Sequence, residues 1–212
     1  EGTVVLPAIG KGFEGLKYSI QISTLDCTGC EVCVNTCPGK KGEKALKMVP
    51  IETAVNAGQA EQSKYFFENV SYKDSLVDKT ANPKNSQFAQ PLFEFSGACG
   101  GCGETPYVKL ISQLFGDHMV VANATGCSSI YGGSFPASPY TTNAKGQGPA
   151  WANSLFEDNA EFGFGMRLAV DQNRDTLKTY VEKVIASGKA PADLVEALEG
   201  AMAHFENSKT EE

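Results

Sequence analysis

Polar and apolar residues alternate over residues 17–23. A period of two is typical of a half-buried β-strand, because successive side chains of a strand point to opposite faces. A second short strand is predicted over residues 44–48, where Pro50 is expected to end it. Residues 1–50 are therefore expected to form a small β-rich domain.

Residues 51–95 lose this periodicity and are rich in Lys, Asp, Asn, Ser and Gln. We expect a mostly irregular connector here. The aromatic run from Tyr65 to Phe67 would hold the connector against a neighbouring part of the protein.

Helix signals are stronger after residue 96. Thr105 is expected to cap a helix that has Pro106 at its first position, and Gly116 is expected to end it. The apolar run over residues 118–122 suits a buried parallel strand, and a Gly-Cys turn follows. This order predicts an α/β sheet with a site at the carboxyl end of the strand.

Three further helices are predicted. After Gly148-Pro149, apolar residues spaced by four and seven indicate one long amphipathic helix over residues 151–170. Two others are expected over 174–186 and 191–205. The fold class is thus α+β in the first part of the chain and α/β in the second.

Charge and hydropathy exclude two kinds of partner. The net charge is −7 and no basic block occurs, which argues against nucleic acid. No apolar run approaches the roughly 20 residues needed to span a bilayer. The chain begins at Glu1 rather than Met and shows no signal-peptide pattern, so we expect either a processed start or, in preference, further residues upstream, and a cytoplasmic location.

The cysteines carry most of the chemistry. Seven cannot pair completely into disulfides, and they are clustered rather than scattered, which favours metal binding. The expected metal ligands are Cys27, Cys30, Cys33, Cys37, Cys99, Cys102 and Cys127.

The run Cys27-x2-Cys30-x2-Cys33-x3-Cys37-Pro38 is the most specific pattern. Its short spacings let one loop supply three thiolates to a [4Fe–4S] cluster, and the fourth cysteine reaches the other cluster of a two-cluster ferredoxin. A zinc knuckle is the alternative, although zinc sites usually pair two CxxC hooks across a longer loop.

A glycine-rich CxxC, Cys99 to Cys102, stands just before the predicted helix, and Cys127 follows the predicted strand. Alone, a CxxC fits a redox dithiol, a zinc hook or a cluster hook. Glu104 could simply complement the helix dipole. Together the three cysteines leave a cluster one ligand short.

The stretches GACGGCGETPY (97–107), ANATGCSS (122–129) and GQGPAWANSLFED (146–158) resemble the signatures of pyruvate:ferredoxin (flavodoxin) oxidoreductases. The run from Cys27 to Cys37 resembles the second cluster motif of that family's ferredoxin domain. The resemblance covers the whole chain in order. It implies half of a two-cluster ferredoxin-like domain (1–50), the connector (51–95), and the first part of a thiamine-diphosphate-binding domain (96–212).

The resemblance also implies roles. Cys27, Cys30 and Cys33 would hold one ferredoxin-type cluster and Cys37 its partner. The other three cysteines would hold the cluster nearest thiamine diphosphate. Glu104 and Cys127 would contact that cofactor, and no residue is assigned to catalysis.

The whole enzyme would oxidatively decarboxylate pyruvate with coenzyme A to acetyl-CoA and CO₂. Electrons would pass to ferredoxin or flavodoxin, and the enzyme is expected to be a homodimer. Several family features are absent: the upstream cluster motif, the motif whose carboxylate binds Mg²⁺, and the fourth ligand of the proximal cluster. The Mg²⁺ ligands would lie outside this chain, and the chain alone is expected to be inactive. A free-standing ferredoxin-like carrier, or an oxidoreductase acting on another 2-oxoacid, remain as alternatives.

Overall fold

The computed structural model describes residues 3–156 and 159–205. The chain divides into two compact units. The first holds the residues up to Val121 together with Thr125–Asn153, and the second holds Ala122–Ala124 and the residues from Ser154 onward. No helix among the described residues is long and apolar enough to cross a membrane.

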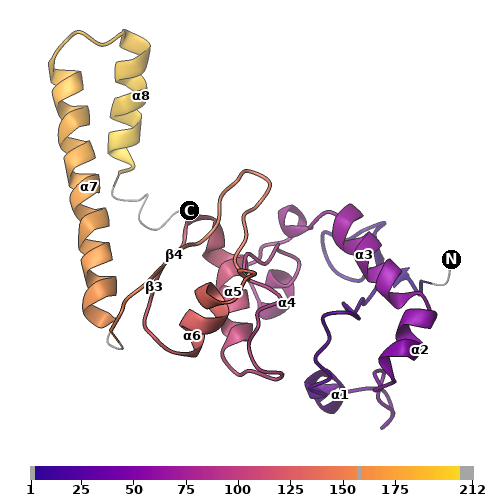
Figure 1. The fold of residues 1–212 in the computed structure, drawn as a ribbon. Helices are drawn as coiled ribbons and strands as arrows, with labels where there is room; N and C mark the ends of the chain where they lie inside the picture. The colour runs from indigo at the N-terminus through magenta and orange to yellow at the C-terminus, as the bar shows by residue number, and fades with distance from the viewer. Residues whose placement is uncertain (1–2, 157–158, 206–212) are drawn as a thin grey trace. The chain divides into compact units, whose positions relative to one another are not determined.

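The first unit begins with two short strands, β1 (Leu6–Pro7) and β2 (Lys17–Tyr18), which pair antiparallel. Its helices are short and joined by irregular segments (Figure 1). They are α1 (Val32–Thr36), α2 (Ile51–Asn56), α3 (Gln59–Asn69), η1 (Asp74–Leu76), α4 (Pro83–Ser86), α5 (Thr105–Phe115), η2 (Gly116–His118), α6 (Cys127–Ser129) and η3 (Ile130–Ser134).

The strands of residues 1–50 are shorter than predicted. The alternation over 17–23 produces a strand only at Lys17–Tyr18, and Ile20 beyond it is exposed. The prediction of a strand over 44–48 was wrong, because these residues form no strand. The backbone of Ala45 and Leu46 instead approaches the sulfur of Cys37, so these residues do not join a ladder.

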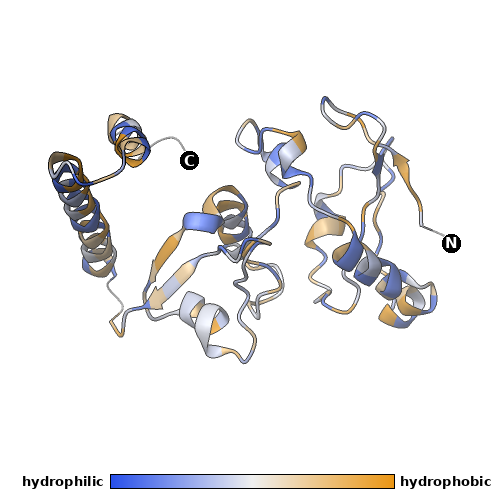
Figure 2. Cartoon of the chain, turned by 90° about the horizontal axis from the view of Figure 1, so that it is seen from above, coloured by the Kyte–Doolittle hydropathy of each residue, from blue (hydrophilic) through white to orange (hydrophobic). Residues whose placement is uncertain are grey.

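The expectation of an irregular connector was wrong for residues 51–69, which form helices α2 and α3. Gly58 separates them in a left-handed conformation (φ 73°). The surface of α3 is largely polar, which obscures the helical period. Its polar and apolar residues are only weakly separated onto different faces, and Figure 2 shows them mixed along the helix.

The helix predicted after Cys102 is confirmed as α5, and Gly116 is its C-cap. The cap was misplaced by one residue: Glu104 is the N-cap, with Thr105 and Pro106 at the first two helical positions. The predicted strand also forms, as β3 (Val120–Asn123), two residues later than expected at its start. Val120 is exposed within the chain, so β3 is not buried as predicted.

The long helix predicted over 151–170 is confirmed only from Ala160, where α7 (Ala160–Ala186) begins, and is wrong at its start. Residues Ala150–Asn153 form strand β4, which pairs with β3. The two strands run parallel, because the amide of Ala150 donates to the carbonyl of Met119 and that of Ser154 to Asn123. The helix prediction included Trp151 because this residue fits the spacing of the apolar positions that follow. Parallel pairing with β3 instead gives it an extended conformation.

The second unit contains a helical hairpin of α7 (Ala160–Ala186) and α8 (Ala192–Ala203). Helix α7 is continuous through the break that had been predicted before residue 174. The guanidinium of Arg174 lies over the ring of Phe205, 5.0 Å from its centroid. Gly188 turns the chain between the helices with φ 64°. The helix predicted over 191–205 is confirmed by α8.

A core in the first unit surrounds Phe93, which is 1% exposed. Its ring meets the rings of Tyr131 and Tyr140 edge-on, with centroids 5.7 and 4.9 Å apart. Phe93 and Tyr140 also face each other across an isolated antiparallel bridge. The segment after α4 and the segment after η3 are thereby joined at one aromatic cluster.

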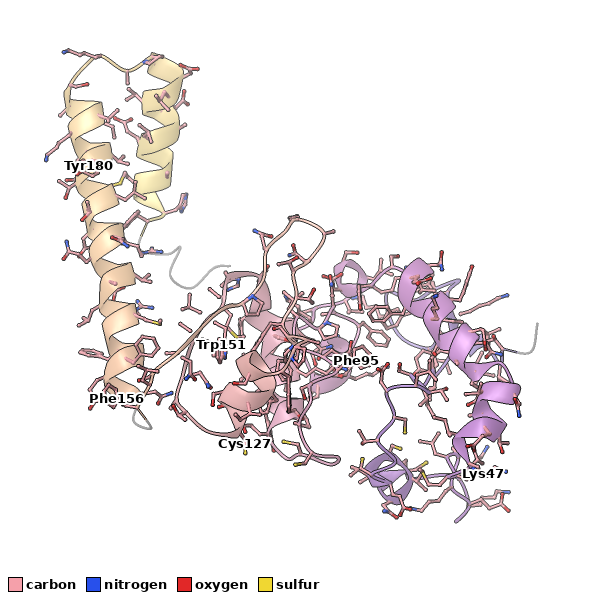
Figure 3. All side chains as sticks on the ribbon, in the orientation of Figure 1. Lys47, Phe95, Cys127, Trp151, Phe156 and Tyr180 are labelled. Atoms are coloured by element: carbon pink, nitrogen blue, oxygen red, sulfur yellow. The ribbon has the colours of Figure 1, made fainter. Side chains whose placement is uncertain are left out.

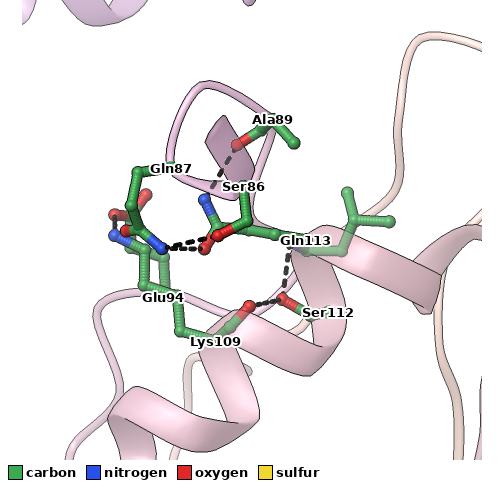
Figure 4. A network of polar contacts seen from close by, with 8 residues as sticks. Ser86, Gln87, Ala89, Glu94, Lys109, Ser112 and Gln113 are labelled. Carbon is green, nitrogen blue, oxygen red and sulfur yellow. Dashed lines mark hydrogen bonds and ion pairs between the residues drawn. The ribbon is translucent and has the colours of Figure 1, made fainter. Parts of the chain in front are cut away.

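Polar contacts fix helix α5 against the segment that precedes Phe93 (Figure 4). The Ser112 hydroxyl accepts a hydrogen bond from the amide of Leu92 (3.1 Å) and donates to the carbonyl of Lys109 (2.7 Å). The side-chain amide of Gln113 donates to the carbonyl of Ala89 (3.0 Å). Lys109 pairs with Glu94 at 2.9 Å. These contacts set the position of the helix whose N-cap is Glu104.

Candidate metal and cofactor site

The first three cysteines line one hollow. Cys27, Cys30 and Cys33 face an open cavity of about 270 Å³. Its remaining walls include the apolar side chains Ile22, Met48 and Phe95. Three thiols on one loop beside apolar walls suit an iron–sulfur cluster, although the three side chains are not close enough together to hold a single metal ion.

The loop that carries these cysteines bends at two residues of positive φ. Gly29 has φ 68° and Glu31 has φ 64°. Left-handed residues change the direction of the chain sharply, which lets a short segment direct successive side chains into the same hollow. Glu31 then caps α1, which carries Cys33.

Cys37 does not line that hollow, and backbone amides surround its sulfur. Hydrogen bonds from the backbone of Ala45, Gly39 and Leu46, in that order of effect, lower the pKa of its thiol. Lys44 lies close by, and its ammonium donates to the carbonyls of Val34 and Asn35 at the end of α1. Amide donors stabilise a thiolate, which is the form that binds iron.

Cys102 has a similar environment at the start of α5. The amides of Thr105 and Glu104 donate toward its sulfur and lower the pKa of the thiol, and the Glu104 amide lies 3.4 Å from Sγ. The amide of Cys102 donates to the carbonyl of Cys99 (3.0 Å), which closes the turn between the two cysteines. Gly101 in this turn has φ 74°.

The turn from Cys99 to Cys102 lies against the first cysteine loop. A Cβ atom on Gly100 would lie 3.1 Å from the Thr28 hydroxyl and 3.3 Å from Cβ of Cys30. Glycine at position 100 therefore allows a close approach of two loops that carry predicted cluster ligands. The linear sequence, in which these loops are about 70 residues apart, does not reveal their proximity.

Cys127 is the first residue of α6 and follows the carboxyl end of β3, as predicted (Figure 3). Gly126 and Ser129 fix this turn: the amide of Gly126 donates to the Ser129 hydroxyl (2.8 Å), which donates back to the Gly126 carbonyl (2.6 Å). Among the described residues, no three His, Cys, Asp or Glu side chains are close enough together to hold a single metal ion. The structure does not bring the Cys127 sulfur together with those of Cys99 and Cys102 in such a group.

Glu104 is exposed, and its side chain makes no capping hydrogen bond to α5. Its charge instead acts on two tyrosines of the aromatic cluster. Burial first, and then the Glu104 carboxylate, raise the pKa of both Tyr131 and Tyr140. The carboxylate therefore lies on the side of the first unit that also carries Tyr131 and Cys102.

Sequence reasoning missed Tyr131. It belongs to η3, a π-helix that directly follows α6, and π-helices occur often at functional sites. Adjacent glycines admit the indole of Trp151, because a Cβ on Gly133 would lie 2.6 Å from the ring. The Gly132-Gly133 pair after an aromatic residue was the one signal in the sequence that could have indicated it.

No family model matches the chain. Individual proteins do. The chain is 58% identical over 187 residues to the pyruvate:ferredoxin oxidoreductase of Moorella thermoacetica, which covers 87% of this chain and 15% of that protein. It is 57% identical over 180 residues to the pyruvate-flavodoxin oxidoreductase of Enterobacter agglomerans, covering 82% of this chain and 14% of that protein.

The chain is homologous to one part of the pyruvate:ferredoxin (flavodoxin) oxidoreductases. A further relative is the mitochondrial pyruvate dehydrogenase [NADP(+)] of Euglena gracilis, 53% identical over 178 residues, which is 82% of this chain and 10% of that protein. The resemblance read from the three signature stretches is thereby confirmed. The chain spans about one seventh of the length of its first relatives.

Proposed function

We propose that this chain forms part of an oxidoreductase that converts pyruvate and coenzyme A to acetyl-CoA and CO₂ and delivers the electrons to ferredoxin or flavodoxin. The homology to enzymes named for pyruvate and for these acceptors carries the proposal. The relative from Euglena is named for NADP(+). Because relatives named for different acceptors share this segment, we assign the choice of acceptor to other parts of the protein.

The cysteines fit iron–sulfur clusters in two respects. Three of them face one hollow with apolar walls, and two others have thiols whose pKa is lowered by backbone amides. Cys27, Cys30 and Cys33 would hold one cluster, and Cys37 would bind its partner. Cys99, Cys102 and Cys127 would contribute three ligands to another. Bound [4Fe–4S] clusters accept and pass on single electrons.

Glu104 and Cys127 are assigned to the thiamine diphosphate pocket. Cys127 lies at the carboxyl end of a parallel strand, where α/β folds place ligands, and Glu104 has no partner within its own helix cap. Thiamine diphosphate, held with Mg²⁺, supplies the carbanion chemistry when bound. In this assignment residues 1–50 belong to the ferredoxin-like part and residues from 96 onward to the cofactor-binding part.

The test uses the full-length protein that carries this sequence, purified without oxygen. Iron and acid-labile sulfide should approach the content of three [4Fe–4S] clusters, and addition of pyruvate and coenzyme A should reduce them. Cys33→Ser should lower the cluster content by about one. Stoichiometric zinc without labile sulfide would overturn the cluster assignment, and reduction by another 2-oxoacid but not pyruvate would overturn the substrate.

A further inference from the structure

Tyr131 holds a buried hydroxyl beside the candidate cofactor site. The residue is 3% exposed, and its ring is fixed edge-on against Phe93. Its backbone belongs to the π-helix η3, where the indole of Trp151 covers the adjacent glycines. Burial and the contact with Phe93 restrict the directions in which the hydroxyl can point.

Within the part of the chain that the structure describes, this hydroxyl has no partner at full hydrogen-bond geometry. Buried hydroxyls in folded proteins nearly always have a partner, because an unpaired donor that has lost its water is destabilising. An exception in a conformationally restricted ring calls for an acceptor nearby.

Glu104 is such an acceptor. It is exposed, and its carboxylate forms no hydrogen bond to the end of α5, although it precedes the first turn of that helix. After burial, its charge is the strongest influence on the pKa of Tyr131, which is raised well above the usual range of a phenol. The hydroxyl therefore keeps its proton near neutral pH and can donate it in a hydrogen bond. A side-chain hydrogen bond with Glu104 is also among the causes that raise this pKa, so the carboxylate lies beside the hydroxyl.

We propose that Tyr131 is a positioning residue for Glu104: its buried hydroxyl donates a hydrogen bond to the carboxylate and orients it toward bound thiamine diphosphate. The bond is charge-assisted, and such bonds are stronger and more directional than bonds between neutral groups. The proposal rests on the proposed function, because it takes the contact of Glu104 with the cofactor as given.

The test is a double-mutant cycle in the full-length protein, with Tyr131→Phe, Glu104→Ala and the pair. Tyr140→Phe is the matched control, since it removes a hydroxyl from the other ring that packs on Phe93 but at a half-buried position. The first measurement is the thermal midpoint of the protein without thiamine diphosphate. The second is the dissociation constant for thiamine diphosphate.

Tyr131→Phe is expected to lower the thermal midpoint and to weaken thiamine diphosphate binding about tenfold, the usual effect of losing a hydrogen bond to a charged group. Both losses should nearly vanish when Glu104 is already alanine. Tyr140→Phe should change the dissociation constant less than about twofold. Cluster content should be unchanged in all variants.

Two results would overturn the proposal. An unchanged or higher thermal midpoint in Tyr131→Phe, with full cofactor affinity, would mean that the hydroxyl is unpaired in the assembled protein. A loss of affinity that persists in the Glu104→Ala background would mean that the hydroxyl contacts the cofactor directly. If Glu104→Ala itself binds thiamine diphosphate like the unaltered protein, the assigned role of Glu104 fails, and coupled thermal midpoints would then show that the Tyr131–Glu104 bond serves stability alone.

Discussion

The sequence allows two interpretations of Glu104. An acid before a helix complements the helix dipole, and the signature stretch around it implies contact with a cofactor instead. In the structure Glu104 occupies the N-cap, but its side chain does not cap. Its carboxylate acts on tyrosines that lie far along the chain.

Replacing Glu104 with glutamine in the full-length protein should therefore weaken thiamine diphosphate binding and spare the clusters. The expected loss is about 1–3 kcal/mol, the contribution of one charge-assisted hydrogen bond. Cofactor titration measures the first effect, and electron paramagnetic resonance of the reduced protein measures the second. Asp117→Asn, which removes the exposed carboxylate that pairs with His118, is the control and should change neither. Wild-type affinity in Glu104→Gln would leave only the dipole role.

Individual site residues differed in how far the sequence revealed them. The run from Cys27 to Cys37 predicts metal ligands from its spacing, because cluster ligation requires nearby thiolates on a loop, whereas the roles predicted for Cys99, Cys102 and Cys127 depended on the family resemblance. Tyr131 could not, since a tyrosine beside two glycines looks like an ordinary turn residue. Its burial depends on Phe93, which lies 38 positions earlier, and on the indole of Trp151.

At the scale of elements, the turn after Cys37 depends on one glycine. Gly39 has φ 60°, and a Cβ at this position would lie 1.9 Å from the carbonyl oxygen of Glu43. The two residues flank a small hairpin, in which the amide of Lys40 donates to that carbonyl (2.9 Å). The hairpin returns the chain so that Ala45 and Leu46 reach the sulfur of Cys37.

Gly39→Ala should therefore disturb the Cys37 ligand, whereas Gly42→Ala in the same turn should not. Gly42 has φ 85°, but a Cβ added there would have no neighbouring atom within 4 Å, so alanine adds only backbone strain of about 1–2 kcal/mol. We expect a lower iron and sulfide content in Gly39→Ala than in Gly42→Ala. Equal cluster content in the two variants would show that the backbone amides near Cys37 are dispensable.

The buried side of α5 is polar, contrary to its apolar pattern. Ser112 and Gln113 are 2% and 3% exposed, whereas the aromatic Tyr107 is 69% exposed. The buried polar pair satisfies backbone groups of the preceding segment, so hydrogen bonds as well as apolar contacts hold α5 in place.

Gln113→Ala should lower the thermal stability of the first unit, because it leaves the Ala89 carbonyl buried without a donor. The expected loss is about 1–3 kcal/mol. Calorimetry of the full-length protein measures it as a lower midpoint. The exposed Gln172 on α7 provides the same substitution away from any core, and Gln172→Ala should lower the midpoint by much less.

Sequence patterns predicted elements best where they were local. Helix α5 is bounded by Pro106 and Gly116, which act within one turn, and α8 follows Pro191 in the same way. Strand β4 was missed because its conformation is set by pairing with β3, a segment about 30 residues earlier. Helices α2 and α3 were missed because their exposed polar residues mask the helical period.

At the scale of the whole molecule, a large hollow opens on the first unit. Its volume is about 1380 Å³, and its walls include aromatic residues from several segments. Among them are Phe13, Phe66, Phe67, Phe88 and Phe95. Phe67 and Phe95 are 64% and 53% exposed, although their rings contact each other edge-on with centroids 6.0 Å apart. An open apolar surface of this kind usually marks a contact with another part of a protein.

The 212-residue chain expressed alone should therefore bind an apolar fluorescent dye such as anilinonaphthalene sulfonate, and the full-length protein should bind much less per chain. The relatives are much longer than this chain, and we expect polypeptide that corresponds to their remaining length to cover the hollow. Phe67→Asp should reduce dye binding to the isolated chain, whereas a matched change at Phe164 on α7, outside the hollow, should reduce it less. Equal dye binding by the two proteins would show that the hollow stays open.

The π-helix after Cys127 also has an evolutionary consequence. A π-turn contains one more residue than an α-turn, so it behaves as a single-residue insertion within a helix. Losing one residue between Ile130 and Ser134 would restore α-helical winding and rotate the residues beyond it by roughly 100°. Relatives that share the buried tyrosine should therefore keep the length of this segment unchanged, even where the identities of its residues vary.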